Sequence, residues 1–339
     1  MEVFQSSRKV CKFLLLLFRD SLASKIVECE DNPEVVKFHP SSERLVAVQC
    51  NNGSVLLLHP HDSLELAGRR PLVVAHPKHH HFTADMVWGV EASRNHLFAS
   101  SASHDSGFEG FHKAFDIVTR KEVARFNAGG EACCTLALET SVSTALAQST
   151  DASENPKAAY TLRVFEASKL ISRPAQTVEL EPFLAPFDRD RTYSDVNSMS
   201  VSPDGLCVAL GRTDNWTDVY DTRMLTKGPL RSFGHEGEIE PESAETEGSS
   251  KRITTYGIVK TQWVNGPPYG YGLVTGGIDG DVRLWDIKRA ADDPLNGRVL
   301  AHGDSDVATF CLGDVSKGEI PIILYVLSFP VDAILTASL

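Results

Sequence analysis

The fold is decided by the stretch Val274-Thr275-Gly276-Gly277-Ile278-Asp279-Gly280-Asp281-Val282-Arg283-Leu284-Trp285-Asp286. A β-rich run meets the turn pair Asp279-Gly280, and an alternating run ending at Trp285 follows it. Asp-Gly between two such runs favours a tight antiparallel hairpin. Upstream, Gly257–Trp263 predicts one more strand, and Gly234-His235 precedes it across a long acidic segment.

The same order of strands and turns recurs along the chain. One copy combines the strands Val196–Ser202 and Leu206–Gly211 with the turn residues Asp214-Asn215 and a last strand ending in Tyr220-Asp221. An earlier copy starts at Val35 and ends at Leu58-His59. Two looser copies end at Asp116 and Glu166, and a sixth begins at Ala301-His302. A period of this kind indicates a repeat architecture rather than two unrelated domains.

The order Gly-His, strand, strand, Asp-Gly turn and strand ending in Trp-Asp resembles the WD40 repeat. The resemblance implies an all-β fold, a WD40-type β-propeller of four-stranded antiparallel blades. Extending the spacing of the copies to the end of the chain gives about six blades, or a truncated propeller of seven.

In the WD40 family a loop His, a strand Ser or Thr, a turn Asp and a strand Trp form a hydrogen-bonded set. Here the resemblance assigns that structural tetrad to His235, Thr275, Asp279 and Trp285. It also implies a set of residues that end the blade motif: Asp116, Glu166, Tyr220, Asp221, Trp285 and Asp286. Their expected role is stability, because buried polar groups must be paired.

Three segments follow from the pattern. Residues 1–31 are an N-terminal segment whose apolar run Phe13–Phe18 we interpret as a buried strand that could close the last blade. Residues 32–315 form the WD40-like propeller. Residues 316–339 are an apolar tail that supplies either the strands Ile322–Phe329 and Val331–Thr336 of a final blade or an end foreign to the fold.

The overall charge argues against nucleic-acid binding. Lys and Arg number 33 against 45 Asp and Glu, a formal net charge of −12. Binding that neutralises phosphates requires the opposite sign. The 7 cysteines are scattered and odd in number, without a Cys-x-x-Cys pair. Reduced thiols of this kind predict a cytoplasmic or nuclear protein, or one found in both compartments.

No catalytic motif is visible in the sequence. There is no Gly-x-Ser-x-Gly, His-Glu-x-x-His or Ser-x-x-Lys arrangement. The histidines between His76 and His81 have only Asp85 nearby as a carboxylate, so we expect no ordered metal site. The prediction is therefore a protein that is not an enzyme, with no catalytic residue, no cofactor, no metal and no small-molecule substrate.

The preferred function is a protein–protein interaction scaffold within a multi-protein complex. Aromatic and Arg side chains on displayed loops are the expected binding anchors: Arg212, Trp216, Arg223, Tyr269 and Tyr271. The segment Tyr220-Asp221-Thr222-Arg223 is also similar to the Trp-Asp-x-Arg ending with which some WD40 proteins engage cullin-type ubiquitin ligases, which suggests a substrate adaptor.

Two alternatives from other classes stay open at this point. A propeller hydrolase would use carboxylates in a central channel, and a cluster of inward Asp or Glu with raised pKa would favour it. A membrane-tethered propeller would use Ile320–Leu339 as an anchor, although Pro321, Pro330 and Asp332 count against a span. We expect no membrane association.

Overall fold

The structure is a computed structural model of the chain. It describes residues 11–19, 21–29, 33–39, 42–50, 54–58, 72–73, 81–90, 93–103, 110–127, 133–139, 144–150, 160–167, 169–180, 196–235, 257–266, 270–303, 307–312, 322–327 and 334–338. The chain divides into two compact units. Unit 1 comprises Met1–Leu138, Ser143–Ser149 and Arg163–Gln176, and unit 2 comprises Glu139–Val142, Thr150–Leu162 and Thr177–Leu339.

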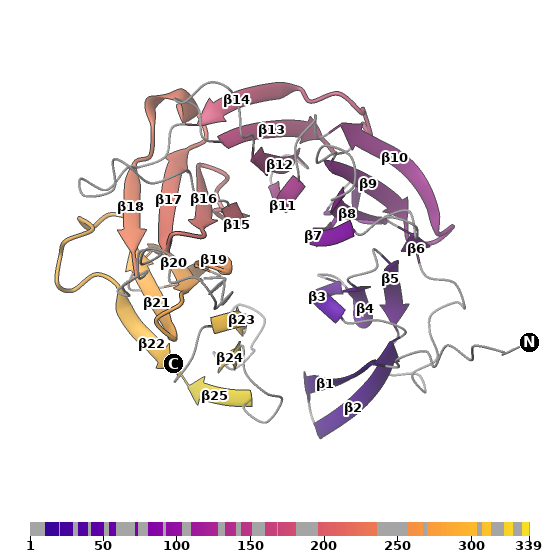
Figure 1. The fold of residues 1–339 in the computed structure, drawn as a ribbon, viewed down its shortest axis with the longest axis horizontal. Coiled ribbons are helices and arrows are strands. Elements are labelled where there is room, and N and C mark those ends of the chain that lie inside the picture. Colours follow the sequence, from indigo (N-terminus) through magenta and orange to yellow (C-terminus); the bar gives the residue numbers. More distant parts are fainter. Residues whose placement is uncertain are drawn as a thin grey trace, which may run out of the picture. The chain divides into compact units, whose positions relative to one another are not determined.

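The described residues form an almost entirely β structure, with a short 3-10 turn at Leu225–Lys227 (Figure 1). Most strands belong to antiparallel four-stranded sheets in chain order. Two of these sheets lie in unit 1: β3 (Pro33–His39), β4 (Ser42–Cys50), β5 (Ser54–Leu58) and β6 (Leu72–Val73), and then β7 (His81–Trp88), β8 (His96–Ser103), β9 (Gly110–Asp116) and β10 (Lys121–Asn127). The next sheet contains β11 (Cys133–Glu139), β12 (Thr144–Thr150), β13 (Tyr160–Glu166) and β14 (Gln176–Leu180).

Two further four-stranded sheets lie in unit 2 and carry the strongest repeats. They contain β15 (Val196–Val201), β16 (Cys207–Arg212), β17 (Trp216–Asp221) and β18 (Arg231–Gly234), and then β19 (Lys260–Gly266), β20 (Gly270–Gly276), β21 (Asp281–Asp286) and β22 (Arg298–His302). The repeat pattern marks the first three strands of each sheet. The fourth strand, which follows the Tyr-Asp or Trp-Asp ending, is short and carries no comparable signal.

The ends of the chain form smaller sheets. The apolar run 13–18 lies in β1 (Cys11–Arg19), which pairs along its length with β2 (Ser21–Cys29). In the apolar tail, β24 (Ile322–Leu327) and β25 (Ile334–Ser338) form an antiparallel sheet with β23 (Val307–Leu312). The tail therefore contributes two strands, close to the segments expected from sequence.

The first strands of consecutive sheets are joined by a repeated tryptophan contact. In unit 1, Trp88 of β7 donates its indole N–H to the Lys37 carbonyl of β3 at 3.1 Å. In unit 2, Trp263 of β19 donates to the Ser200 carbonyl of β15, also at 3.1 Å. The same device at the same place in both units is a structural signature of the repeat.

Apolar packing joins the two strong sheets of unit 2. One buried cluster combines Ala209, Val219 and Phe233 of the β15–β18 sheet with residues of the β19–β22 sheet: Trp263, Leu273 and Trp285. A second cluster joins the β19–β22 sheet to Val307 and Phe310 of β23. Burying one Val, Leu or Phe side chain of these clusters stabilises the folded state by roughly 1.5–3 kcal/mol relative to leaving it exposed.

Candidate functional site

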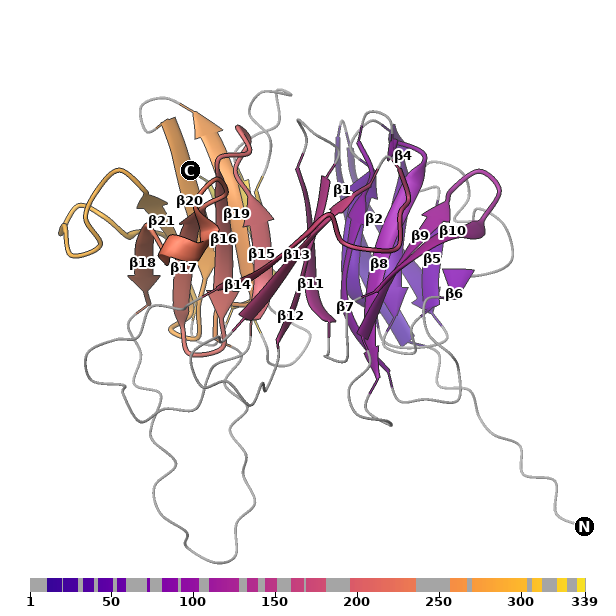
Figure 2. The ribbon, with the colours of Figure 1, turned by 90° about the horizontal axis from the view of Figure 1, so that it is seen from above.

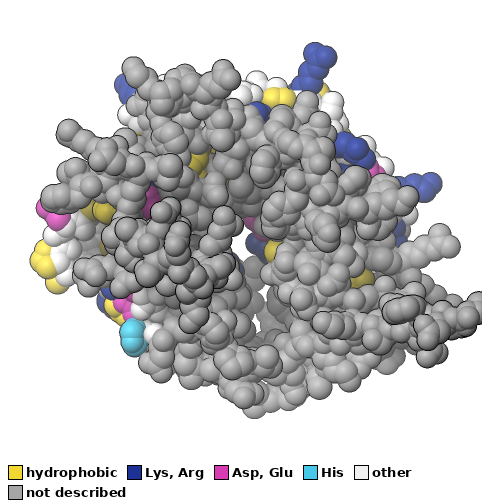
Figure 3. Space-filling model, viewed as in Figure 1, with side chains coloured by type: hydrophobic (Ala, Val, Ile, Leu, Met, Phe, Trp, Pro, Cys, Tyr) yellow, Lys and Arg dark blue, Asp and Glu magenta, His cyan; other side chains and the backbone are white. Residues whose placement is uncertain are grey.

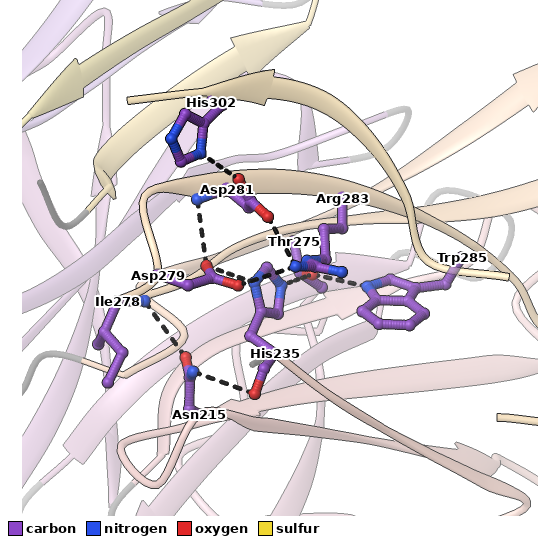
Figure 4. Close-up of polar contacts among 9 residues, drawn as sticks. All are labelled: Asn215, His235, Thr275, Ile278, Asp279, Asp281, Arg283, Trp285 and His302. Carbon is purple, nitrogen blue, oxygen red and sulfur yellow. Dashed lines mark hydrogen bonds and ion pairs between the residues drawn. The ribbon is translucent and has the colours of Figure 1, made fainter. Parts of the chain in front are cut away.

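The four residues assigned to the tetrad form one hydrogen-bonded chain, with Thr275, Asp279 and Trp285 in the β19–β22 blade and His235 directly after β18 (Figure 4). Trp285 Nε1 lies 2.8 Å from Thr275 Oγ1, and Thr275 Oγ1 lies 2.6 Å from His235 Nε2. His235 Nδ1 lies 2.9 Å from Asp279 Oδ1. An indole can only donate and an ionised carboxylate can only accept. The direction consistent with every partner is therefore Trp285 to Thr275, Thr275 to His235, and His235 to Asp279, with the imidazole protonated on Nδ1.

His235 comes from the preceding sheet, so this chain of bonds links neighbouring sheets. It follows directly on β18, and its side chain is fully buried against β20 and β21. The backbone of Asn215, in the turn between β16 and β17, accepts a hydrogen bond from the His235 N–H at 3.1 Å. The Asn215 side chain in turn accepts one from the Ile278 N–H at 3.3 Å. Removing the His235 side chain would break its bonds to Thr275 and Asp279, which cross the boundary between the sheets.

Gly277 makes room for the histidine. A Cβ at this position would lie 2.4 Å from His235 Nδ1 and 2.9 Å from Asp279 Oδ1. Real Cβ atoms do not approach that closely, so a side chain here would displace the imidazole. The glycine is thus required by the tetrad itself.

The tetrad continues outward through charged groups. Arg283 Nη2 lies 3.3 Å from Asp279 Oδ2 and 2.6 Å from Asp281 Oδ2. Asp281 Oδ1 lies 2.6 Å from Nδ1 of His302, whose side chain is exposed. Burial acts to raise the pKa of Asp279, but the hydrogen bonds from His235 and from the Asp281 N–H, with the charge of Arg283, outweigh it, so the pKa is lowered. The group is therefore a stable carboxylate and not a proton donor.

Arg212 was expected to anchor a partner, and that hypothesis is wrong. The residue is 4% exposed. Its guanidinium pairs with Asp214 and, at 2.8 Å, with Asp218, which is fully buried and accepts a bond from Ser232 Oγ at 2.6 Å. A buried cation is held in place by carboxylates that compensate its charge. This pairing could not be predicted from the sequence, because nothing in the repeat pattern distinguishes Asp218 from an ordinary strand residue.

Tyr220 belongs to the same network. It occupies in β17 the register position that Trp285 occupies in β21. Burial raises the pKa of Tyr220. The neighbouring Asp218 and Tyr160 raise it further, and Asp218 also shares a hydrogen bond with the phenol. The phenol is a neutral structural group.

The blade-terminal residues all end the third strand of a four-stranded sheet. The structure places Asp116 at the end of β9, Glu166 at the end of β13, Tyr220-Asp221 at the end of β17 and Trp285-Asp286 at the end of β21. Several of these carboxylates cap the turn that follows. Asp116, Asp221 and Asp286 each accept the backbone N–H two residues further on.

Arg223 is exposed beside the Asp221 cap. Its side chain is 66% exposed, and it donates from Nε to Asp221 Oδ1 at 2.9 Å and from Nη2 to Asp221 Oδ2 at 2.6 Å. These hydrogen bonds lower the pKa of Asp221 to about 2. The guanidinium is therefore oriented but remains accessible.

The aromatic candidates are spread over different places. Trp216 is partly buried and packs on Gly234, where a Cβ would lie 3.0 Å from its ring. Tyr271 lies in β20 opposite Asn265 of β19, and Tyr269 lies outside the described residues. Arg223 and Trp216 lie at opposite ends of β17 or just beyond it, so the structure does not bring these candidates together.

The described residues contain no group of three or more His, Cys, Asp or Glu side chains placed to bind a metal. The predicted histidine cluster lies largely outside them, since only His81 of it is described. Where a carboxyl pKa is shifted in the described part of the chain, it is lowered, as at Asp116, Glu122, Asp221 and Asp279. No helix in that part is long and apolar enough to cross a membrane.

Comparison with known proteins agrees with this architecture. No family model matches the chain. It is 27% identical over 257 residues to Rik1-associated factor 1 of Schizosaccharomyces pombe, an alignment that covers 73% of this chain and 36% of the relative. The chain thus spans about a third of that relative's length.

A solved structure, that of the Dos1 propeller, is similar with a TM-score of 0.57 and 21% sequence identity. The match covers 89% of this chain and 70% of the other. This chain has the β-propeller fold. The four-stranded antiparallel sheets described above are its blades.

Proposed function

We propose that the chain is a non-enzymatic, WD40-type propeller scaffold that binds protein partners within a multi-protein complex. The WD40 assignment is supported by the hydrogen bonds among His235, Thr275, Asp279 and Trp285. These four residues serve the framework, since His235, Thr275 and Trp285 are buried and the four are hydrogen-bonded to one another. Binding then falls to residues displayed outside the framework.

Arg223 is the observation that carries the proposal. An exposed guanidinium held bidentately by Asp221 is preorganised, so less side-chain freedom is lost when a partner binds. Its place after Tyr220-Asp221 is that of the Arg in the Trp-Asp-x-Arg ending. The finer proposal is a substrate adaptor of a ubiquitin ligase. In the neighbouring blade Lys288 stands at the matching position and lacks the planar fork of Arg.

The relative named above supports a partner-binding role. Its name describes a factor associated with another protein, Rik1. We propose a partner of the same kind for this chain, and an intracellular location in the cytoplasm, the nucleus or both. No catalytic step, cofactor, nucleic acid, membrane or small-molecule substrate is part of the proposal.

Co-expression with a Rik1-type protein from the same organism tests the proposal. The two chains are expected to co-elute on size exclusion, and Arg223→Glu is expected to weaken binding by about tenfold. Arg125→Glu is the matched control, because Arg125 is also exposed and paired with a carboxylate, Glu122, but lies in unit 1. The scaffold proposal fails if the wild-type chain does not co-elute. The adaptor proposal fails if both variants bind like the wild type.

A further inference from the structure

The described part of unit 2 exposes five large hydrophobic side chains. They are Leu206 (40% exposed), Met224 (42%), Leu230 (44%), Leu295 (74%) and Val299 (44%). Scattered single residues of this kind would need no explanation, but a continuous patch indicates an interaction surface. Whether these five are connected therefore decides their meaning.

Hydrogen bonds and ion pairs connect the turns that carry most of them, which places these residues on neighbouring turns of the two blades. The turn holding Leu206 is bonded to the turn after β17, because the Thr222 N–H donates to the Leu206 carbonyl at 3.0 Å. The Met224 N–H donates to the Asp221 carbonyl, also at 3.0 Å. The short 3-10 turn Leu225–Lys227 then leads toward Leu230 and β18 (Figure 2).

Arg231 connects the β15–β18 blade to the β19–β22 blade through a hydrogen bond. Its Nε donates to the carbonyl of Arg289 at 3.3 Å. Arg289 in turn pairs with Asp293 at 3.2 Å, and Asp293 accepts the N–H of Leu295 at 2.9 Å. We call the surface formed by Leu206, Met224, Leu230, Leu295 and Val299, with the charged residues between them, the two-blade surface. Figure 3 shows hydrophobic side chains at the edge of the molecule where β18 and β22 lie in Figure 1.

The carboxylates of this surface are hydrogen-bonded to the backbone of their own turns. Asp204, Asp221, Asp286 and Asp293 each accept the backbone N–H of the residue two positions on. The residues placed outward by these turns are Leu206, Arg223, Lys288 and Leu295, all of them exposed. Asp221 is buried and Asp204, Asp286 and Asp293 are only partly exposed, so the most exposed positions of these turns are not acidic.

The exposed charges are consequently mostly positive. Within 202–206, 221–231 and 286–299 the exposed cationic side chains are Arg223, Lys227, Arg231, Lys288 and Arg298, whereas the one exposed acidic side chain is Asp292. This excess stands out in a chain with a net charge of −12. Exposed cationic and apolar residues are adjacent in the chain at Arg223-Met224, Leu230-Arg231 and Arg298-Val299, so a complementary partner carries acidic groups beside apolar ones.

We propose that the two-blade surface docks a segment of a partner protein in which acidic residues alternate with large apolar residues. This inference rests on the proposed scaffold function and specifies the chemistry of what the scaffold binds. The apolar side chains favour a protein segment over a nucleic acid, whose phosphates would use the cations alone. Arg289 lies outside the Trp-Asp-x-Arg-like segment, but like Arg223 it is held by Asp side chains, Asp286 and Asp293.

The test measures fluorescence anisotropy of short labelled peptides with the full chain. The probes are a peptide alternating Glu with Leu, a Lys/Leu peptide, a Glu/Ser peptide and a single-stranded DNA oligonucleotide. The Glu/Leu peptide is expected to bind at least about fivefold more tightly than each of the others. Equal binding of the Lys/Leu or Glu/Ser peptide, or tighter binding of the oligonucleotide, overturns the proposal.

Variants then locate the binding. Leu230→Asp and Leu295→Asp are each expected to weaken the Glu/Leu peptide at least about fivefold. Val118→Asp is the matched control, because Val118 is 75% exposed and follows the Asp116 cap in the same geometry, but in unit 1. A loss as large in Val118→Asp contradicts the assignment. Co-elution with a Rik1-type protein together with peptide failure would refute this surface while leaving the scaffold function standing.

Discussion

The β15–β18 and β19–β22 blades of unit 2 have the same strand order and register but differ in their buried polar side chains. In the β19–β22 blade, Gly277 leaves space for His235, and Arg283 supplies the charge beside Asp279. In the β15–β18 blade, Arg212 stands where Gly277 stands, and Asp218 stands where Arg283 stands. Both blades keep an Asp in the turn, Asp214 or Asp279, but the Arg that pairs with it comes from the second strand in one blade and from the third strand in the other. One blade is thus held by a hydrogen-bonded relay and the other by a buried ion pair.

The turns of the two blades keep the same backbone conformation. Asn215 has φ of 70° and Gly280 has φ of 78°, both in the left-handed region. Asn is the residue other than Gly that most readily adopts this region. The comparison teaches that turn geometry is preserved, while the side chains that satisfy it are free to change.

The largest expected effect comes from breaking the buried ion pair. Asp218→Asn leaves the Arg212 charge partly uncompensated in the interior, which should cost about 3–5 kcal/mol of unfolding free energy. Arg283→Ala in the other blade should cost less, because Arg283 is partly exposed to water. Urea unfolding measures both. A loss in Asp218→Asn no greater than that in Arg283→Ala would contradict the distinction between the blades.

Filling the space at Gly277 should be the next largest effect. Gly277→Ala forces the imidazole of His235 to move and should cost about 1–3 kcal/mol. In the double variant with His235→Ala, the extra cost of the new methyl group should largely disappear, because the clashing ring is gone. Thermal melting of the four proteins gives the coupling. Purely additive effects would show that Gly277 serves the backbone and not the histidine.

A smaller effect is expected from the first donor of the relay. Trp285→Phe removes the N–H that bonds Thr275 and should cost about 1 kcal/mol beyond the loss of packing. Trp263→Phe is the control, since Trp263 also donates one hydrogen bond, but to a backbone carbonyl outside the tetrad. Combining Trp285→Phe with Thr275→Val should cost less than the sum. Additivity of those two variants would argue against a connected relay.

The smallest effect is the pH dependence of Asp279. Its pKa is lowered on folding, so its contribution to stability is present above the unfolded value, near ~4. That contribution is lost as pH falls through the folded pKa. The stability difference between wild type and Asp279→Asn should therefore be constant at neutral pH and shrink below about pH 4. A difference that grows on acidification would reverse the sign and refute the assignment.

Sequence reasoning succeeded where a motif fixes both residue type and position. Asp-Gly and Asp-Asn pairs located the turns, and the Trp-Asp and Tyr-Asp endings located the ends of third strands. It failed for Arg212, because an arginine beside a turn is ordinarily exposed and its partner Asp218 lies across a strand pair. The two-blade surface was equally hidden. Its apolar residues come from three separate turns and an edge strand, and only the folded structure brings them together.

Stability and binding should separate cleanly if the framework and the displayed residues have different roles. The most direct test measures, for one Rik1-type partner, both affinity and melting temperature in His235→Ala and Arg223→Glu. We expect His235→Ala to lower the melting temperature while affinity stays within about twofold, and Arg223→Glu to weaken binding about tenfold with unchanged melting. If Arg223→Glu binds normally, or if His235→Ala loses binding while its melting is unchanged, the division between framework and binding surface is wrong.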